Sequence, residues 1–186
     1  MKKNKIIQLS FPGTGSTVLI NIIHGLLCPD KAVTIGVKGF PHNRDIIKTH
    51  IYSHCDPNEQ SGRFGIDRWQ DKFSNSYNLY FICSERKGLK NSALLDKKYH
   101  TYNNVLIIPY EKLLETSSYT VEDIVSFVAK KIKAFLPRTY EMKEQFAIDR
   151  IKKMNKTYEK IKDKPFSYCD KFFHIHGSHR GRIDKN

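Results

Sequence analysis

A run of glycine and hydroxyl residues near the N-terminus has the composition of a phosphate-binding loop. The run is Pro12-Gly13-Thr14-Gly15-Ser16-Thr17, and it separates a β-rich segment, residues 5–10, from apolar residues at helical spacing in residues 17–27. Glycines let backbone N–H groups turn inward and approach an anion closely. The start of a helix adds unpaired donors and the positive end of its dipole. The order strand, loop, helix therefore predicts a site for a phosphate or sulfonate group, with a plain connecting turn as the alternative.

The composition of this loop argues against two common nucleotide-binding motifs. The ATPase form, GxxxxGK[ST], needs a lysine before its last hydroxyl residue, and residues 12–17 contain none. The dinucleotide form, GxGxxG, also fails, because Gly13 and Gly15 are followed by Ser16, Thr17 and Val18. Ser16 or Thr17 is expected to cap the helix that follows.

A second group of residues that could take part in catalysis is Lys48-Thr49-His50, at the end of a strand predicted over residues 45–50. A histidine with a pKa near neutrality can take a proton from a hydroxyl group. Side chains alternate along a strand, so Lys48 and His50 are expected on the same side of the sheet. A cation there can stabilise negative charge that grows on a leaving oxygen. The alternative is a surface histidine beside a solvated lysine.

The remaining pattern indicates how these residues are positioned. Further strands are predicted at residues 32–37, 79–84 and 105–109, and the last two are short, almost wholly apolar runs typical of central parallel strands. Helices are predicted over residues 88–99, from Thr120 to near Pro137, and over 139–163, and Thr120 with Asp123 resembles a capping box. Alternating strands and helices predict one α/β domain over residues 1–186, with a mainly parallel central sheet between two helical layers.

Residues 53–78 are polar and carry no clear periodicity. We interpret them as an active-site loop or lid. Phe64, Trp69 and Phe73 within this stretch offer either a stacking surface for an acceptor or ordinary core packing.

Together, the loop and the Lys48-Thr49-His50 segment resemble the sulfotransferase family. That family's 5′-phosphosulfate loop usually reads Tyr-Pro-Lys-Ser-Gly-Thr-Thr-Trp after the first strand, and here Phe11 to Val18 is similar in its Pro, Gly and hydroxyl positions. The chain has Gly13 where the family often has Lys, and Val18 where it often has Trp. Lys-Thr-His at the end of a strand is similar to the second signature of the family.

Two further segments extend the resemblance. In the family, a buried strand is followed by an Arg and, eight residues later, a Ser, and both bind the nucleotide 3′-phosphate. Ser92 matches that serine, the arginine position falls on Ser84, and Arg86 lies two residues beyond. The segment from Asn104 to Leu114 is similar to a scaffold strand followed by Tyr-Glu-Asp-Leu. The terminal segment is like one that closes over the 3′-phosphate, and its candidates are His179, Arg180, Gly181 and Arg182.

The resemblance implies a P-loop-like fold and transfer of a sulfuryl group. The donor would be 3′-phosphoadenosine 5′-phosphosulfate, and the acceptor a hydroxyl group of a small molecule or carbohydrate. His50 would act as the general base, and Lys48 would help to bind the sulfuryl group. No metal is implied, since no carboxylate or His cluster has the spacing of metal ligands.

Charge and cysteine content leave other classes of protein open. The net charge of +13 favours anionic partners, so a degenerate nucleotide-binding or nucleic-acid-binding protein is an alternative, as is a kinase-like phosphotransferase. No RNP, KH, zinc-finger or helix-turn-helix signature supports the nucleic-acid interpretation. The four cysteines form no CxxC pair, and no apolar run suits a signal peptide or a membrane span. We therefore expect a cytoplasmic protein with reduced thiols.

Overall fold

Four parallel strands form the centre of the fold in the computed structural model, which describes residues 2–11, 13–28, 45–50, 65–87, 95–161, 163, 169–170 and 175–176. The strands are β1 (Lys3–Ser10), β2 (Ile46–His50), β3 (Tyr77–Glu85) and β4 (Val105–Pro109). Their order is β2-β1-β3-β4, and every neighbouring pair is parallel. The predicted α/β class with a parallel sheet is therefore confirmed.

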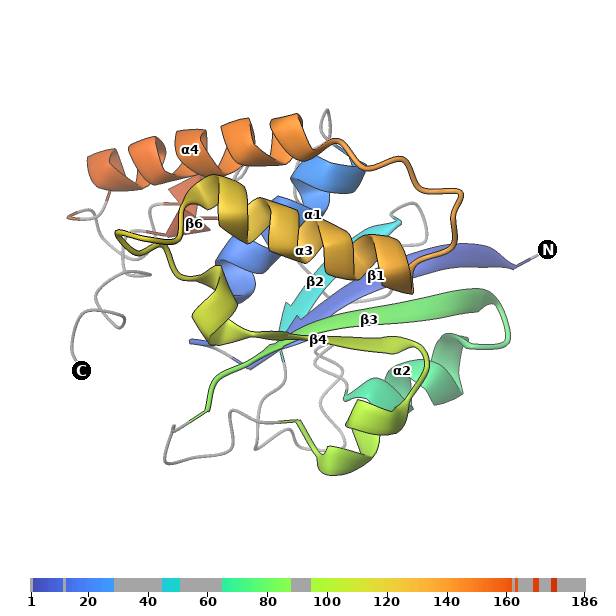
Figure 1. Cartoon of the computed structure of the whole chain (residues 1–186). Coiled ribbons are helices and arrows are strands. Elements are labelled where there is room, and N and C mark those ends of the chain that lie inside the picture. The colour runs from blue at the N-terminus through green and yellow to red at the C-terminus, as the bar shows by residue number, and fades with distance from the viewer. Residues whose placement is uncertain are drawn as a thin grey trace.

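Helices cover both faces of this sheet (Figure 1). On one face lie α1 (Ser16–Leu27), α3 (Val121–Phe135) and α4 (Glu144–Ile161), and on the other lies α2 (Ile66–Phe73). Two 3₁₀ turns, η1 (Lys97–Thr101) and η2 (Tyr110–Leu113), flank β4. A short antiparallel pair, β5 (Cys169–Asp170) and β6 (Ile175–His176), follows α4.

Strand alternation divides the apolar core into two parts. Ile6 of β1 and Ile82 of β3 point toward α1, α3 and α4, whereas Ile7 and Phe81 point toward Trp69 of α2. All of these side chains are buried, which explains why the strands read as apolar runs. Trp69 and its neighbour Phe73 thus pack in the core, the second of the two roles considered for them.

The order of the strands creates a switch point in the sheet. From β1 the chain passes through α1 to β2 on one side, while β3 pairs with the other side of β1. In open α/β sheets, ligands bind at the carboxyl ends of the strands where the winding reverses in this way. Here that position lies where β1 ends at Ser10 and β3 ends at Glu85.

Most predicted elements are present with shifted ends. The strand predicted at 105–109 has the bounds of β4, but its predicted central position is wrong, because it lies at an edge of the described sheet and is only partly buried. The strands predicted at 5–10, 45–50 and 79–84 lie within two residues of β1, β2 and β3. The capping box of Thr120 and Asp123 is confirmed at the start of α3, while the charged helix predicted from residue 139 begins only at Glu144. The strand predicted at residues 32–37 lies outside the described residues.

Two segments were predicted wrongly. Residues 53–78 are not wholly a loop, because α2 and the start of β3 lie within them. The helix predicted over residues 88–99 is not present in its described part, since residues from Lys97 onward form the 3₁₀ turn η1, with the Asp96 carboxylate accepting a hydrogen bond from the Lys98 N–H. An aspartate that bonds the backbone two residues on favours a tight turn over a continuous helix.

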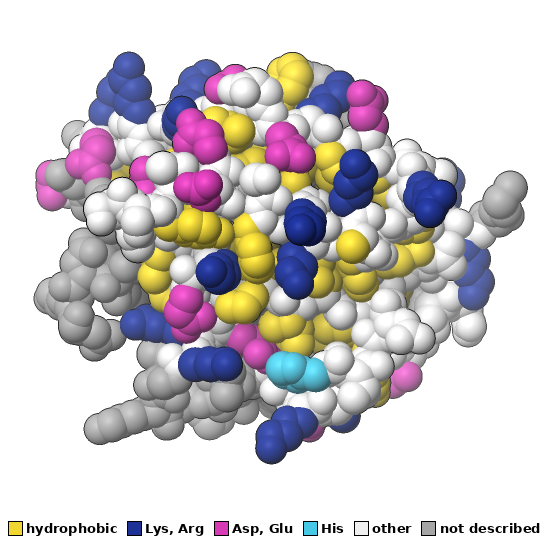
Figure 2. All heavy atoms as spheres, viewed as in Figure 1, with side chains coloured by type: hydrophobic (Ala, Val, Ile, Leu, Met, Phe, Trp, Pro, Cys, Tyr) yellow, Lys and Arg dark blue, Asp and Glu magenta, His cyan; other side chains and the backbone are white. Residues whose placement is uncertain are grey.

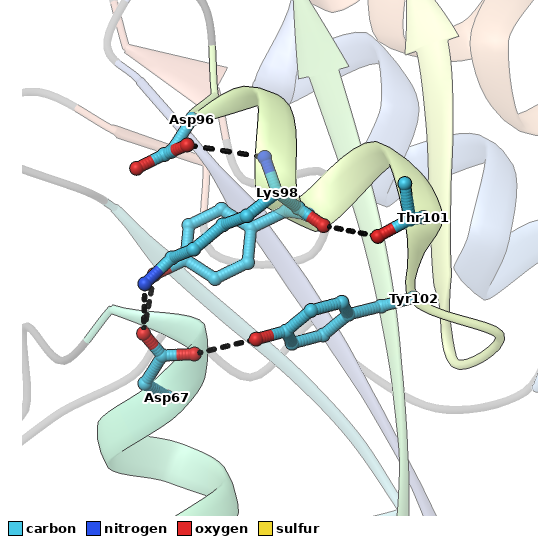
Figure 3. A network of polar contacts seen from close by, with 6 residues as sticks. Asp67, Asp96, Lys98, Thr101 and Tyr102 are labelled. Carbon is cyan, nitrogen blue, oxygen red and sulfur yellow. Dashed lines mark hydrogen bonds and ion pairs between the residues drawn. The ribbon is translucent and has the colours of Figure 1, made fainter.

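A network of polar contacts centred on Asp67 joins α2 to η1 (Figure 3). One of its carboxylate oxygens accepts hydrogen bonds from Lys98 Nζ at 2.6 Å and from the Tyr99 hydroxyl at 2.9 Å. The hydrogen bond from Lys98 lowers the pKa of Asp67, with the tyrosine hydroxyls adding to the effect. The network attaches α2 to the edge of the sheet, although α2 itself has few apolar residues.

Close approach of α1 and α4 yields the first prediction. A Cβ atom at Gly25 of α1 would lie 2.5 Å from the Cα of Ala147 in α4, so backbone would have to move. We expect Gly25→Ala to lower the free energy of unfolding by about 1–3 kcal/mol, the usual range for overpacking. Urea denaturation measures the change. Gly65→Ala is the control, since a Cβ there meets no atom within 4 Å, and equal effects of both substitutions would contradict this packing.

Candidate functional site

The candidate site is the turn between β1 and α1, which we call the β1–α1 loop and define as residues 11–15. β1 ends at Ser10 and α1 begins at Ser16. Two residues of the loop have left-handed backbone conformations, Gly13 with φ 82° and Gly15 with φ 75°. Residues other than glycine rarely adopt such φ angles, so this path of the chain requires both glycines. The helix follows directly, so the first amides of α1 belong to the same turn.

The predicted side-chain cap of α1 is wrong. The N-cap residue is Gly15, and no described side chain caps the helix. Leu19 N–H donates to the carbonyl of Gly15 in the first helical hydrogen bond. Helices whose first-turn amides lack a capping side chain need another acceptor for them. An anion can supply that acceptor, because the helix start also carries the positive end of the dipole.

Buried hydroxyl groups hold the loop against the ends of the strands. Ser10 Oγ accepts hydrogen bonds from the Ser84 N–H at 2.8 Å and from Gln8 Nε2 at 2.6 Å. The Ser84 hydroxyl lies 2.9 Å from Ser10 Oγ and 3.0 Å from Thr14 Oγ1, and Thr14 donates to the carbonyl of Phe11. Ser84 and Thr14 are fully buried, so the hydroxyl groups of these predicted ligand residues face each other in the interior rather than the solvent. These hydroxyl groups position the backbone of the loop.

Two side chains of η2, Tyr110 and Leu113, pack against the loop at Gly15. A Cβ atom at Gly15 would lie 2.9 Å from Leu113 Cδ1 and 3.0 Å from Tyr110 Cδ2. The positive φ angle of Gly15 thus favours glycine, and a side chain there would also crowd Leu113 and Tyr110. Arg86, which follows β3, places its guanidinium carbon 5.0 Å from the centre of the Tyr110 ring.

Lys48 lies on β2 beside the centre of β1, where its register partner is Gln8. Both side chains are almost completely buried. Because side chains alternate along the strand, Lys48 shares the face of Ile46, which α1 covers. Burial lowers the pKa of Lys48 to about 7, because desolvation disfavours the charged amine. A lysine with this pKa takes up or releases a proton near neutrality.

The other predicted residues are placed only in part. The backbone of His50 pairs with that of Ser10, so His50 stands at the same edge of the sheet as the loop. Ser16 is buried and Thr17 is half-buried at the start of α1. Outside the described residues lie the side chain of His50 and the whole of Pro12, Ser92, His179, Arg180, Gly181 and Arg182.

Two residues of the site have roles that sequence reasoning missed. Gln8 was counted only as part of a strand, but its Nε2 donates to Ser10 and its Oε1 has no hydrogen-bond partner among the described residues. The role of Gln8 could have been suspected from the sequence, because it is a polar residue at a core-facing position of an otherwise apolar strand. Tyr110 was interpreted as scaffold, and no local pattern indicates its contact with Gly15.

Surface charge is mixed on the face shown in Figure 2, which carries α3 and α4. Lys and Arg side chains stand beside Asp and Glu there, and Lys152 of α4 forms an ion pair with Glu122 of α3.

Within the part of the chain that the structure describes, no group of three or more His, Cys, Asp or Glu residues is arranged to hold a metal ion. Among the same residues, no helix combines the length and apolar character needed to cross a membrane. Comparison with protein-family models, with curated proteins and with solved structures found no match to this chain.

Burial of Lys48 generates the second prediction. In the unfolded chain a lysine has a pKa of about 10.4, so between pH 7 and that value the unfolded state binds a proton that the folded state has released. The contribution of Lys48 to the free energy of unfolding of the natural protein therefore rises with pH in this window. We expect Lys48→Met to be the more stable protein below pH 7. Its advantage should shrink by on the order of 1 kcal/mol per pH unit above pH 7.

Urea denaturation of both proteins between pH 6 and pH 9 measures this difference. Burial also raises the pKa of Cys83, which opposes the trend in alkaline solution, but that effect is common to both proteins and cancels. Exposed Lys130→Met controls for the loss of a lysine. If the free energy of unfolding of Lys48→Met exceeds that of the natural protein by a constant amount across this range, the lowered pKa of Lys48 is contradicted.

Proposed function

We propose that this chain binds a phosphate-rich nucleotide at the β1–α1 loop and transfers a sulfuryl group from 3′-phosphoadenosine 5′-phosphosulfate to an acceptor hydroxyl. One observation carries the proposal: a loop with two left-handed glycines opens a helix that no described side chain caps, at the switch point of a parallel sheet. Such a turn directs amides and a helix dipole at one point, which suits a doubly charged group. The resemblance of residues 11–18 and 48–50 to the sulfotransferase signatures specifies the nucleotide and the reaction.

In the proposed mechanism the amides of Gly13 to Thr17 hold the 5′ end of the donor. His50 takes the proton of the acceptor hydroxyl, whose oxygen forms a new bond to sulfur. The bond from sulfur to the bridging phosphate oxygen breaks in line, and adenosine 3′,5′-bisphosphate leaves. Positioning and charge stabilisation do most of the catalysis in such transfers. The lack of a loop lysine at Gly13 leaves this charge stabilisation to other groups.

Lys48 is our candidate for that missing cation. It lies on the strand next to β1 and shares the sheet face over which α1 begins. A lysine whose pKa is about 7 is partly uncharged in the unliganded protein. A bound dianion favours the charged amine, so the charge is strongest when the ligand is present. Loss of one such positioned cation costs on the order of 100-fold in rate.

Nucleotide preference tests the binding half of the proposal. At about 100 times its dissociation constant, a ligand stabilises the folded state by about 2.7 kcal/mol, which for a chain of this length raises Tm by roughly 5–10 °C. We expect adenosine 3′,5′-bisphosphate to produce this shift, and ATP with magnesium or oligonucleotides to produce less.

Gly15→Ala should abolish the shift, because the added methyl group meets Tyr110 and Leu113, while Gly65→Ala keeps it. A larger shift with ATP and magnesium favours a kinase-like phosphotransferase instead. A larger shift with oligonucleotides favours a nucleic-acid-binding protein.

Transfer of labelled sulfate to a panel of sugars, phenols and steroids tests the catalytic half. We expect His50→Ala to lower kcat by roughly 10²–10⁴-fold, the usual contribution of a general base. His100→Ala is the matched control, since that histidine is half exposed and pairs with Glu85 at 3.1 Å. Undiminished transfer by the His50 variant removes His50 from the mechanism.

A further inference from the structure

The guanidinium group of Arg86 rests on the ring of Tyr110. Arg86 is the first residue after β3 and is half-buried, and its guanidinium carbon lies 5.0 Å from the centre of the ring. A cation within about 6 Å of a ring centre is attracted by the negative face of the ring. The planar guanidinium of arginine suits this contact better than the ammonium of lysine does.

The same ring also touches the β1–α1 loop. Tyr110 Cδ2 and Cε2 would lie 3.0 Å and 3.3 Å from a Cβ atom at Gly15, and Leu113 packs beside them. Tyr110 is only 4% exposed, so its ring is fixed by its surroundings. One rigid side chain therefore joins Arg86 to the loop, although the three residues are distant from one another in the sequence.

No carboxylate of a described residue forms an ion pair with Arg86. The ion pairs between described residues involve Lys5, Lys98, Lys152 and His100, and none involves Arg86. Its neighbour Glu85 already accepts hydrogen bonds from the Leu95 N–H at 2.7 Å and interacts with His100. Among the described residues, Arg86 is thus a half-buried cation beside the switch point, with a ring face as its partner.

We infer that Tyr110 is a positioning residue for this site: its ring holds the Arg86 guanidinium at the edge of the β1–α1 loop, so that the guanidinium and the loop amides bind the same nucleotide. The inference rests on the proposed function, since it assumes a nucleotide at the loop. The absence of a Cβ at Gly15 lets the Tyr110 ring pack closely on the loop in this arrangement. Arg86 supplies planar, paired donors, which suit a phosphate group.

A double-mutant cycle tests the inference, with adenosine 3′,5′-bisphosphate as the probe and isothermal titration calorimetry as the measurement. We expect Arg86→Gln and Tyr110→Leu each to weaken binding about tenfold. In the Arg86→Gln background, Tyr110→Leu should have little further effect, because the ring acts through the guanidinium. Tyr110→Phe keeps the ring and should bind within about twofold of the natural protein. Arg138→Gln, an exposed arginine after α3, is the matched control for lost charge.

Three results have distinct meanings. Failure of the natural protein to bind the probe overturns the proposed function, and the inference with it. Equal binding by the natural protein and Arg86→Gln overturns the inference alone. Additive losses in the double variant also overturn it, because Tyr110 then acts by packing on the loop.

Spectroscopy without ligand decides the case if Tyr110→Leu does not fold. Protons held over a ring face are shifted upfield, so the Arg86 Nε–H signal should be upfield in the natural protein and in Tyr110→Phe. An Arg86 signal at the position typical of exposed arginines contradicts the inference.

Discussion

The path of the chain from β1 into α1 is the constraint on which the rest of this structure depends. It reverses direction within five residues, and it does so through two glycines with positive φ angles. From below, the hydroxyls of Ser10, Thr14 and Ser84 bond the turn to the ends of β1 and β3. From the side, η2 packs so closely on Gly15 that a Cβ there would lie 2.9 Å from Leu113 Cδ1 and 3.0 Å from Tyr110 Cδ2. A turn held from two directions keeps its amides in one arrangement before any ligand arrives, which lowers the entropy lost on binding.

Polar groups buried next to this turn are the second notable feature. Ser10, Thr14 and Ser84 satisfy one another, but Gln8 Oε1 and Asn21 Oδ1 have no hydrogen-bond partner among the described residues. Lys48 adds an amine to the same face of the sheet, with its pKa lowered by desolvation. Unpaired buried oxygens and a desolvated amine reduce stability, and structures retain such groups chiefly where function uses them.

The central strands could be predicted from the sequence because burial on both faces leaves continuous apolar runs, as at Phe81 to Cys83 of β3. The capping box of α3 was equally visible, since Thr120 and Asp123 are neighbours in the sequence. Helix α2 was missed, because its attachment depends on Ile66, Trp69 and the contacts of Asp67 with distant tyrosines rather than on a long apolar stripe. The glycine loop was recognised by composition, but its support by Tyr110 was not. That support is tertiary, joining residues nearly a hundred positions apart.

In the proposed site the loop amides converge on one anion, and nuclear magnetic resonance tests this convergence most directly. During titration with adenosine 3′,5′-bisphosphate, the backbone N–H signals of residues 13–17 should move downfield more than any others, since hydrogen bonds to a phosphate deshield amide protons. The change should saturate, and it should be absent in Gly15→Ala. Largest shifts in another part of the chain, with the loop signals unmoved at saturation, would contradict the central claim.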